Sequence, residues 1–348
     1  MTAHDSRNEK KSAYHCKSMK PRTLLTLVLL TACTRPDTTA QFRGNTMGTT
    51  YQVTYPSQLT NKTVAMEVET LLAEINSSMS TYDPASMISG LNASTDTSAW
   101  HPTDSHFATV FRRSREVYED SGHTFNPAVG PLVNAWGFGP VDSDTSPDED
   151  AVRALLKVVQ FEAFELRESP LAVRKTTAGA QLDFSAIAKG YGVDAVGELM
   201  ESKGIQDYLV EIGGEVRARG RAWRVGIEQP ASGALADREI LSVVRLNNVG
   251  LATSGTTRNY RMENGRKIAH ILDPRTGYPA QNSLLSVSVM AKDTMTADAY
   301  ATALMVMGLE EGLRFVEARP QLQAYFIAMD EGGNIVEKRT SGFPVAEK

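Results

Sequence analysis

The sequence is poor in cysteine and in clustered positive charge. Its two cysteines, Cys16 and Cys33, precede the part of the chain that has a globular pattern. Because that part has no thiol, it cannot contain a disulfide, a thiolate metal site or a cysteine nucleophile. The net charge is -5, and no run of Lys and Arg follows the first few dozen residues. The sequence accordingly predicts no nucleic-acid partner.

Long apolar runs are also missing, and the one short run has a specific setting. Lys20 and Arg22 precede an apolar stretch over 24–30, which leads into Leu30-Thr31-Ala32-Cys33. The stretch is far shorter than the roughly 20 residues that span a bilayer. The order of basic residues, apolar run, small residues and Cys resembles the lipobox of bacterial lipoproteins, in which the Cys is lipidated. The alternative is an incidental Cys after a short apolar start.

We therefore divide the chain into three parts. Residues 1–33 are expected to be an N-terminal extension and a lipoprotein signal peptide, with Met19 as the start and Cys33 as the lipidated residue. Residues 34–43 follow as a tether that contains Thr and Pro. Residues 44–340 are expected to form the functional domain, in which we find no repeat and no Pro/Gly/Ser-rich linker.

The domain mixes helical and strand patterns. Apolar residues at helical spacing predict helices over 64–79, 107–118, 149–159, 296–307 and 309–318, and the Gly-containing segment 183–192 is expected to open a further helix that ends at about Lys203. Short β-rich or alternating runs predict strands over 49–55, 161–166, 171–174, 208–212, 223–227, 240–246 and 283–290, with a hairpin around Gly332-Gly333. Ser146 and Glu149 form a capping-box pattern before the third helix. This is the pattern of an α+β protein, a single compact unit with two lobes.

Two helix starts carry candidate chemistry. Asp298 and Thr302 lie four residues apart, so a carboxylate and a hydroxyl share one helix face that could hold a hard cation such as Mg²⁺. The simpler alternative is an Asp that complements the helix dipole and a Thr that packs. Asp183 and Ser185 are candidate caps at the start of another helix, where Lys189 adds a positive charge to free backbone N–H groups.

Three turns complete the candidates. Gly213-Gly214 and the segment 253–258 let backbone approach a ligand closely, although strand ends also need such turns. The string His270-Ile271-Leu272-Asp273-Pro274-Arg275-Thr276-Gly277 sets a His near a carboxylate, which is the composition of a general base. The alternative is an ordinary Asp-Pro turn after a half-buried His.

Taken in order, these strings resemble the ApbE family of FAD:protein FMN transferases. The resemblance runs from about Gly44 to Asp330. It rests on the order and spacing of Met47-Gly48-Thr49, Ser80-Thr81-Tyr82, Val129-Gly130-Pro131-Leu132-Val133-Asn134, Trp136-Gly137-Phe138-Gly139, the segment 183–192, Ile212-Gly213-Gly214, Thr253-Ser254-Gly255, the His270 string and the helix 296–302.

The resemblance implies an ApbE/T-fold-like protein of mixed sheets with packed helices, which holds FAD in a cleft with Mg²⁺ on the pyrophosphate. The FAD contacts that it implies come from Met47, Tyr82, Thr124, Phe125, Asn126, Asp183, Lys189 and Ile271. The implied metal ligands are the carbonyl of Ala186, Asp298 and Thr302. Asn126 stands where the family often has Asp, and Ala301 stands where some members have a second helix Asp.

The activity implied is the Mg²⁺-dependent transfer of FMN from FAD to a Ser or Thr hydroxyl of an acceptor protein, with release of AMP. We expect His270 to help deprotonate that hydroxyl, with Asp273 or the metal site orienting the reaction. The implied acceptors are flavoprotein subunits of membrane electron-transport complexes, such as sodium-pumping NADH:quinone oxidoreductase or Rnf-type subunits. With the lipid anchor, this implies a location on the periplasmic side of the bacterial inner membrane.

Three other functions are compatible with parts of this pattern. The same cleft would hydrolyse FAD to FMN and AMP if water replaced the acceptor hydroxyl. A non-catalytic FAD-binding lipoprotein would need the pocket residues without the metal ligands. An anchored solute-binding protein would not require the ordered strings.

Overall fold

A computed structural model describes residues 39–59, 62–141, 143, 145–230, 239–256, 260–263 and 265–344. From Thr39 onward these residues form one compact unit, in agreement with the predicted single unit. Cys33 and residues 34–38 lie outside the described residues. Within the described ranges, no helix is long and apolar enough to cross a membrane.

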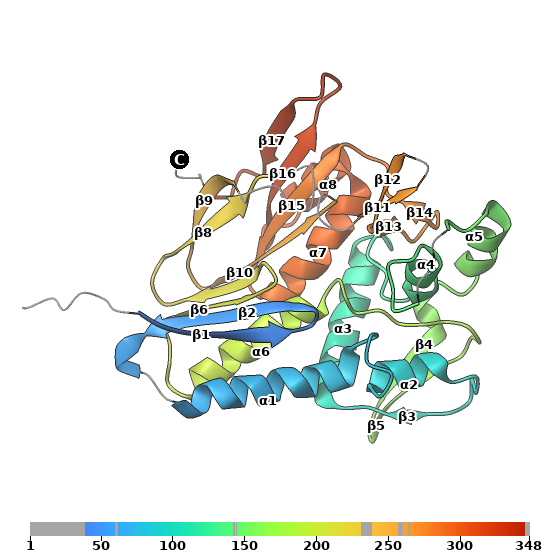
Figure 1. Ribbon diagram of the computed structural model, residues 1–348, viewed down its shortest axis with the longest axis horizontal. Helices are drawn as coiled ribbons and strands as arrows, with labels where there is room; N and C mark the ends of the chain where they lie inside the picture. Colours follow the sequence, from blue (N-terminus) through green and yellow to red (C-terminus); the bar gives the residue numbers. More distant parts are fainter. Residues whose placement is uncertain are drawn as a thin grey trace, which may run out of the picture. The chain divides into compact units, whose positions relative to one another are not determined.

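The main sheet has eight strands in the spatial order β1-β2-β6-β7-β10-β15-β16-β17 (Figure 1). Every neighbouring pair is antiparallel. The strands are β1 (Thr39–Thr46), β2 (Thr49–Pro56), β6 (Tyr208–Ile212), β7 (Glu215–Arg219), β10 (Val249–Gly255), β15 (Leu284–Ala291), β16 (Gln323–Met329) and β17 (Ile335–Arg339). Alternate residues of β2 and β6 are buried, so one face of these strands packs on the interior.

The helices and smaller sheets surround this sheet. The helices are α1 (Lys62–Met79), α2 (Met87–Ala93), α3 (Ser105–Asp120), α4 (Gly130–Ala135), α5 (Glu149–Leu156), α6 (Ala188–Ser202), α7 (Thr294–Met307) and α8 (Leu309–Glu317), with 3₁₀ turns η1 (Ser57–Leu59) and η2 (Phe161–Ala163). The smaller sheets join β3 (His101–Pro102), β5 (Leu171–Lys175) and β4 (Phe164–Glu168); β8 (Trp223–Glu228) and β9 (Ile240–Leu246); β11 (Tyr260–Glu263) and β12 (Arg266–Ala269); β13 (Leu272–Asp273) and β14 (Tyr278–Pro279).

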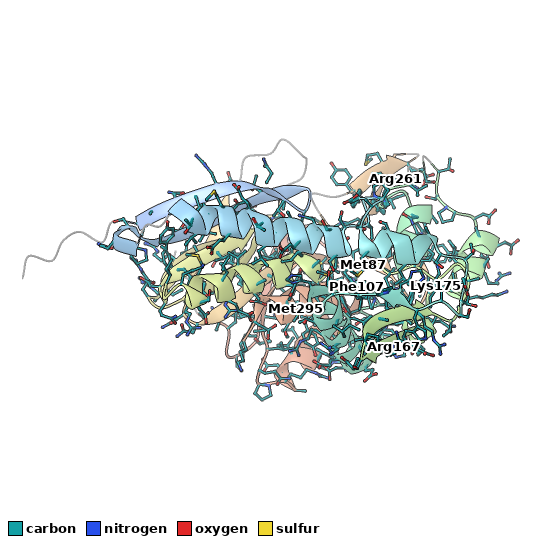
Figure 2. The ribbon with its side chains drawn as sticks, turned by 90° about the horizontal axis from the view of Figure 1, so that it is seen from below. Met87, Phe107, Arg167, Lys175, Arg261 and Met295 are labelled. Atoms are coloured by element: carbon teal, nitrogen blue, oxygen red, sulfur yellow. The ribbon has the colours of Figure 1, made fainter. Side chains whose placement is uncertain are left out.

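Helices α6 and α7 form the centre of the domain. Helix α6 packs on β6 and β7, whereas α7 packs on β10 and β15, and the two helices contact each other. Helix α7 is buried on nearly every side, as its mostly apolar composition requires. Helix α1 covers α6, and α3 packs on α7. Met87 of α2, Phe107 of α3 and Met295 of α7 contribute to the same core cluster (Figure 2).

A buried carboxylate fastens α6 to α7. The two oxygens of Asp194 accept hydrogen bonds from the backbone N–H groups of Thr294, at 3.0 Å, and Met295, at 2.8 Å. Asp194 also pairs with Arg217 of β7 at 3.0 Å. Burial raises the pKa of Asp194 to about 6, against the opposing effects of these hydrogen bonds and of Arg217. One side chain therefore satisfies orphan donors at the start of α7 and joins three elements.

The predicted fold class is confirmed, and most predicted elements are present. Strand β6 has the predicted bounds, and α1, α3, α7 and α8 lie within a few residues of theirs. The helix predicted to open within 183–192 begins at Ala188 and ends at Ser202. The strand predicted over 161–166 begins instead with the 3₁₀ turn η2.

The predicted tether, 34–43, is corrected at its C-terminal end. Residues 39–43 belong to β1, which pairs with β2 along its whole length. Met47 and Gly48 connect the strands with φ values of 48° and 71°. Positive φ at both central residues is typical of a tight two-residue hairpin. β1 stands first in the strand order and is therefore an edge strand of the main sheet.

The predicted capping box is wrong in its N-cap. Helix α5 is capped by Asp148, whose carboxylate accepts from the N–H of Ala151 at 2.8 Å. Ser146 instead bonds Glu263 of β11, through its N–H at 3.0 Å and through its hydroxyl. Asp148, rather than Ser146, is therefore the N-cap, because its carboxylate accepts a hydrogen bond from an N–H group of the first helical turn.

Two further local predictions are also corrected. Asp183 caps a turn rather than a helix, since its carboxylate accepts from the N–H of Ser185 at 2.8 Å, and the N-cap of α6 is Ile187. The turn predicted over 253–258 is the end of β10 as far as Gly255. Thr257 and Arg258 lie outside the described residues.

We predict that Gly190→Ala destabilises the protein by about 1–3 kcal/mol, the usual cost of overpacking. A Cβ at Gly190 would lie 2.5 Å from the carbonyl oxygen of Thr294 and 2.8 Å from Cβ of Asp298. Urea unfolding measures the change. Gly90→Ala in α2 is the matched control, because no atom lies within 4 Å of its Cβ position. Equal stabilities of the two variants would contradict the close approach of α6 and α7.

Candidate functional site

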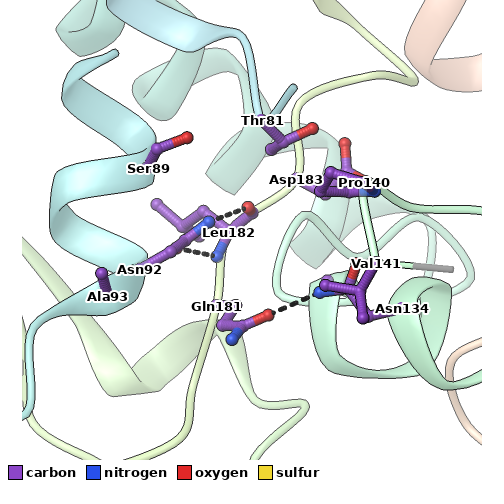
Figure 3. Close-up of a pocket in the computed structure, with 11 residues that line it drawn as sticks. Thr81, Ser89, Asn92, Ala93, Asn134, Pro140, Val141, Gln181, Leu182 and Asp183 are labelled. Carbon is purple, nitrogen blue, oxygen red and sulfur yellow. Dashed lines mark hydrogen bonds between the residues drawn. The ribbon is translucent and has the colours of Figure 1, made fainter. Parts of the chain in front are cut away.

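A pocket of about 210 Å³ lies beside Asp183 (Figure 3). Asn92 of α2 fixes the segment before Asp183, because its amide accepts from the N–H of Leu182 and donates to the carbonyl of Leu182, each at 2.8 Å. Asn134 of α4 donates to the side chain of Gln181 at 2.9 Å. The pocket is smaller than the roughly 300–1,000 Å³ of a typical small-molecule site, so a dinucleotide would extend beyond it.

The segment 124–126 lies next to Asp183. The N–H of Asp183 donates to the carbonyl of Pro127 at 2.7 Å. Thr124, Phe125 and Asn126 are all buried. The amide of Asn126 accepts from the N–H of Ala128 at 2.8 Å and donates to the carbonyl of Val159 at 3.2 Å. The second bond needs an amide donor, which gives a structural reason for Asn rather than Asp at this position.

Tyr82 and His270 meet the same short loop. The hydroxyl of Tyr82, a residue with 64% of its surface exposed, donates to the carbonyl of Phe138 at 3.0 Å. Partial burial and the nearby charge of Asp183 raise the pKa of Tyr82. The ring of Phe138 lies edge-on to that of His270, with 6.3 Å between centroids. Phe138 therefore contacts both Tyr82, the predicted flavin or adenine contact, and His270, the predicted general base.

Asp273 has a defined structural role in the turn after His270. Its carboxylate accepts from the backbone N–H, Nε and Nη2 of Arg275 at 2.9, 3.0 and 2.9 Å. Its carbonyl accepts from the N–H of Gly277 at 2.8 Å, where φ is 81°. Ile271 is buried, and its carbonyl accepts from the N–H of Ala280. These contacts support the turn, and the catalytic role of Asp273 stays a prediction.

A buried charge cluster lies where α6, α7 and β7 meet. Asp298, which is 2% exposed, accepts from the N–H of Gly190 at 2.9 Å. The ammonium of Lys189 lies 3.3 Å from Oε1 of Glu215 and 3.4 Å from the carbonyl of Ser185, the residue before Ala186. Thr302 lies one turn after Asp298, and its hydroxyl is 3.2 Å from that of Ser254.

The charges in this cluster act on one another. Burial alone would lower the pKa of Lys189, but Asp298 and Glu215 raise it above its usual value. Burial raises the pKa of both carboxyl groups, while Lys189 acts in the opposite direction. Two buried carboxylates therefore share one lysine, and a further cation would stabilise their ionised forms.

The cluster fits a magnesium ion that is shared with a substrate. Across the described ranges, no three His, Cys, Asp or Glu side chains are grouped to hold a metal ion. Mg²⁺ commonly takes only one or two protein carboxylates and completes its coordination with water and substrate phosphates. Asp298, Thr302 and the Ala186 carbonyl, the predicted metal ligands, would offer oxygen atoms of this type. Ala301 is fully buried in the core, so a carboxylate at that position would face apolar side chains.

Met47 reaches the same helix from the β1–β2 turn. A Cβ built on Gly192 of α6 would lie 2.9 Å from Cε of Met47, so the Met side chain occupies the space that this glycine leaves. Met47 also packs against the two largest core clusters. The hairpin and α6 are thereby held together at the start of the predicted FAD site.

The family model described as "ApbE family" matches residues 47–326. The chain belongs to the ApbE family. The FAD:protein FMN transferase of Haemophilus influenzae is 35% identical over 326 residues, which cover 90% of this chain and 93% of that protein. The FAD:protein FMN transferase of Vibrio cholerae is 36% identical over 318 residues, or 89% of this chain and 93% of that protein.

Solved structures of ApbE proteins have the same fold. The flavin transferase ApbE from Vibrio cholerae superposes with a TM-score of 0.78 at 34% identity, covering 88% of this chain and 99% of that one. The flavinyl transferase ApbE of Pseudomonas stutzeri, in its apo form, gives a TM-score of 0.77 at 33% identity, covering 88% and 95%. The predicted family is therefore confirmed.

The structure adds Glu215 to the site residues considered from the sequence. It directly follows Gly213-Gly214, the turn that we treated only as a place for close backbone approach. A buried acid after a glycine pair has no distinctive spacing to Asp298 or Lys189. Only the pairing of β6 with β7 and the packing of α6 and α7 on them bring the three charges together.

We predict that Lys189→Met destabilises the protein by about 3 kcal/mol at neutral pH, because it leaves buried carboxylates without their cation. Urea unfolding at several pH values measures the loss. The carboxyl groups of Glu215 and Asp298 have a raised pKa in the folded protein, and without Lys189 this pKa would rise further. Such groups favour the folded protein at low pH, where they are protonated, and destabilise it as rising pH ionises them. The loss should therefore shrink as pH falls toward about 5.

Lys203→Met is the matched control for this prediction. Lys203 pairs with Glu67 at the surface, where the two side chains are 35% and 38% exposed. Exposed pairs typically contribute less than about 1 kcal/mol. A loss for Lys189→Met no larger than that of Lys203→Met, at every pH, would contradict the charge cluster.

Proposed function

We propose that this protein is an FAD:protein FMN transferase. It moves the FMN part of FAD to a Ser or Thr hydroxyl of an acceptor protein, forms a phosphoester bond and releases AMP, with Mg²⁺ as the metal. The observation that carries the proposal is the charge cluster of Asp298, Lys189 and Glu215 in a chain of the ApbE family. The cluster combines a cation for phosphate with acids for a metal, which suits a pyrophosphate substrate.

FAD would bind along the line of residues that the fold brings together. Asp183 lines the pocket and Tyr82 follows Thr81, which also lines it. Met47 lies against α6, and Lys189 lies among the buried acids. The pocket would take one end of FAD, while the pyrophosphate would lie toward Lys189. A lysine ammonium among backbone N–H groups of a helix start is a suitable partner for phosphate oxygens.

The reaction needs no nucleophile from this chain. The acceptor oxygen would attack the phosphorus of the FMN half, and the bond from this phosphorus to the AMP oxygen would break, with AMP leaving with the electron pair. Bound Mg²⁺, held by Asp298, Thr302 and the Ala186 carbonyl, would supply charge stabilisation for the phosphates. His270 would accept the proton of the acceptor hydroxyl, and Phe138 would position its ring.

Intact-mass measurement tests the transfer directly. We expect a purified acceptor domain with a Ser/Thr flavinylation motif to gain the mass of one FMN less one water when it is incubated with FAD, Mg²⁺ and this protein truncated after Cys33. A chelator should abolish the gain, and Asp298→Asn should reduce it strongly. AMP release with an unchanged acceptor mass would instead identify an FAD pyrophosphatase. Bound FAD with neither change would indicate a flavin-binding protein.

The same assay tests His270. We expect His270→Gln to bind FAD normally and to slow transfer by about 10²–10⁴-fold, the usual contribution of a general base. His101→Gln is the matched control, because His101 lies in β3 of a small separate sheet. Transfer by His270→Gln at the rate of the control would remove His270 from this role.

We further propose that Cys33 is lipidated and anchors the enzyme on the periplasmic side of the bacterial inner membrane. Its acceptors there would be flavoprotein subunits of membrane electron-transport complexes. The support is the ordered signal before Cys33 and the fit of such a location to extracytoplasmic acceptors. Mass spectrometry of the N-terminal peptide from membranes should find a diacylated Cys33, and an unmodified residue would contradict the anchor.

A further inference from the structure

Glu215 has an unusual environment for a buried acid. Its side chain is 5% exposed, and it stands at the first position of β7, directly after the Gly213-Gly214 turn. Its Oε1 pairs with Lys189 at 3.3 Å. Its Oε2 is buried and has no hydrogen-bond partner in the described part of the chain. A buried acceptor left unpaired typically costs about 1–3 kcal/mol, so this oxygen calls for an explanation.

Pairing with Lys189 does not account for Oε2. Lys189 already contacts Oε1 and the carbonyl of Ser185. A proton on Oε2 would remove the charge but would leave a buried O–H group that itself needs an acceptor. A cation would satisfy the oxygen and balance the second acid of the cluster, Asp298.

The position of Glu215 relative to α7 supports this explanation. Lys189 pairs with Glu215 at 3.3 Å, and the next residue, Gly190, donates its N–H to Asp298 at 2.9 Å, so the two acids contact consecutive residues of α6. Lys189 interacts with both. Asp298 has one oxygen engaged by the N–H of Gly190. Each acid thus has one oxygen in a contact with α6, and Oε2 of Glu215 remains available to a ligand.

We propose that Glu215 is a further acid of the divalent-cation site, with its Oε2 facing the cation directly or through one water molecule. Its Oε1 keeps Lys189 in place beside it. The inference rests on the proposed function for the identity of the cation, Mg²⁺. It assigns Glu215 a part in metal affinity that is separate from the transfer step.

Calorimetric titration of the FAD-loaded protein with Mg²⁺ tests the proposal. We expect Glu215→Gln to weaken Mg²⁺ binding by about 10–100-fold, the usual effect of losing an acid at or next to a metal. The amide can still accept from Lys189, so the change removes mainly the charge. Thermal unfolding of the metal-free variant checks that the fold is retained.

Glu211→Gln is the matched control. Glu211 lies in β6 of the same hairpin, where its Oε1 accepts from the N–H of Gly214 at 2.6 Å, and it is less buried than Glu215. The substitution removes the same charge nearby and should leave Mg²⁺ affinity within about twofold, because water screens it. If the two substitutions weakened Mg²⁺ binding equally, the effect would come from the loss of any nearby negative charge, and the proposal would be overturned.

The remaining outcomes are also decisive. Wild-type affinity in Glu215→Gln, together with normal transfer by the wild-type protein, would overturn this inference and leave the proposed function intact. Absence of Mg²⁺ binding to the wild-type protein would overturn both. If Glu215→Gln does not fold, Glu215→Asp keeps the charge but shortens the side chain, and we expect weakened Mg²⁺ binding in a folded protein.

Discussion

The contact between α6 and α7 is the constraint on which the rest of the structure depends. The two helices approach so closely that only glycine fits at position 190, and Asp194 of α6 bonds the first N–H groups of α7. Buried groups of this kind are satisfied only in one arrangement, because any slip of one helix would leave donors unpaired. Strands of the main sheet pack against these two helices, and α1 and α3 pack against them as well.

The charge cluster follows from the same contact. Lys189 precedes Gly190, and Asp298 follows Thr294 by about one turn, so helices that meet at Gly190 necessarily bring the lysine and the acid together. Glu215, which directly follows the turn before β7, pairs with the same lysine. Such a group of buried charges is costly for stability, and the cation of the proposed function would offset that cost. Under the proposed function, stability and ligand binding make opposite demands at one place in the fold.

Residue patterns predicted the helices and strands better than the contacts between them. The spacing of Asp298 and Thr302 predicted one helix face correctly, because both residues lie on a single element with a fixed period. Glu215 and the bonds of Asn92 escaped prediction, since they depend on strands and loops that are remote in sequence. At Ser146 the local rule failed because Glu263, from a distant strand, competes for the serine. Asp273 shows the reverse, since its turn role follows from neighbouring residues alone.

The bond from Gly190 to Asp298 spans 108 positions of the chain. Contacts that join distant parts of a chain form only after most of it has been organised, because the intervening segment must first be closed into a loop. A growing or partly unfolded chain consequently lacks the proposed metal site, however complete its first half is. Under the proposed function, ligand capture would be coupled to completion of the whole domain, and bound ligand would report that folding has finished.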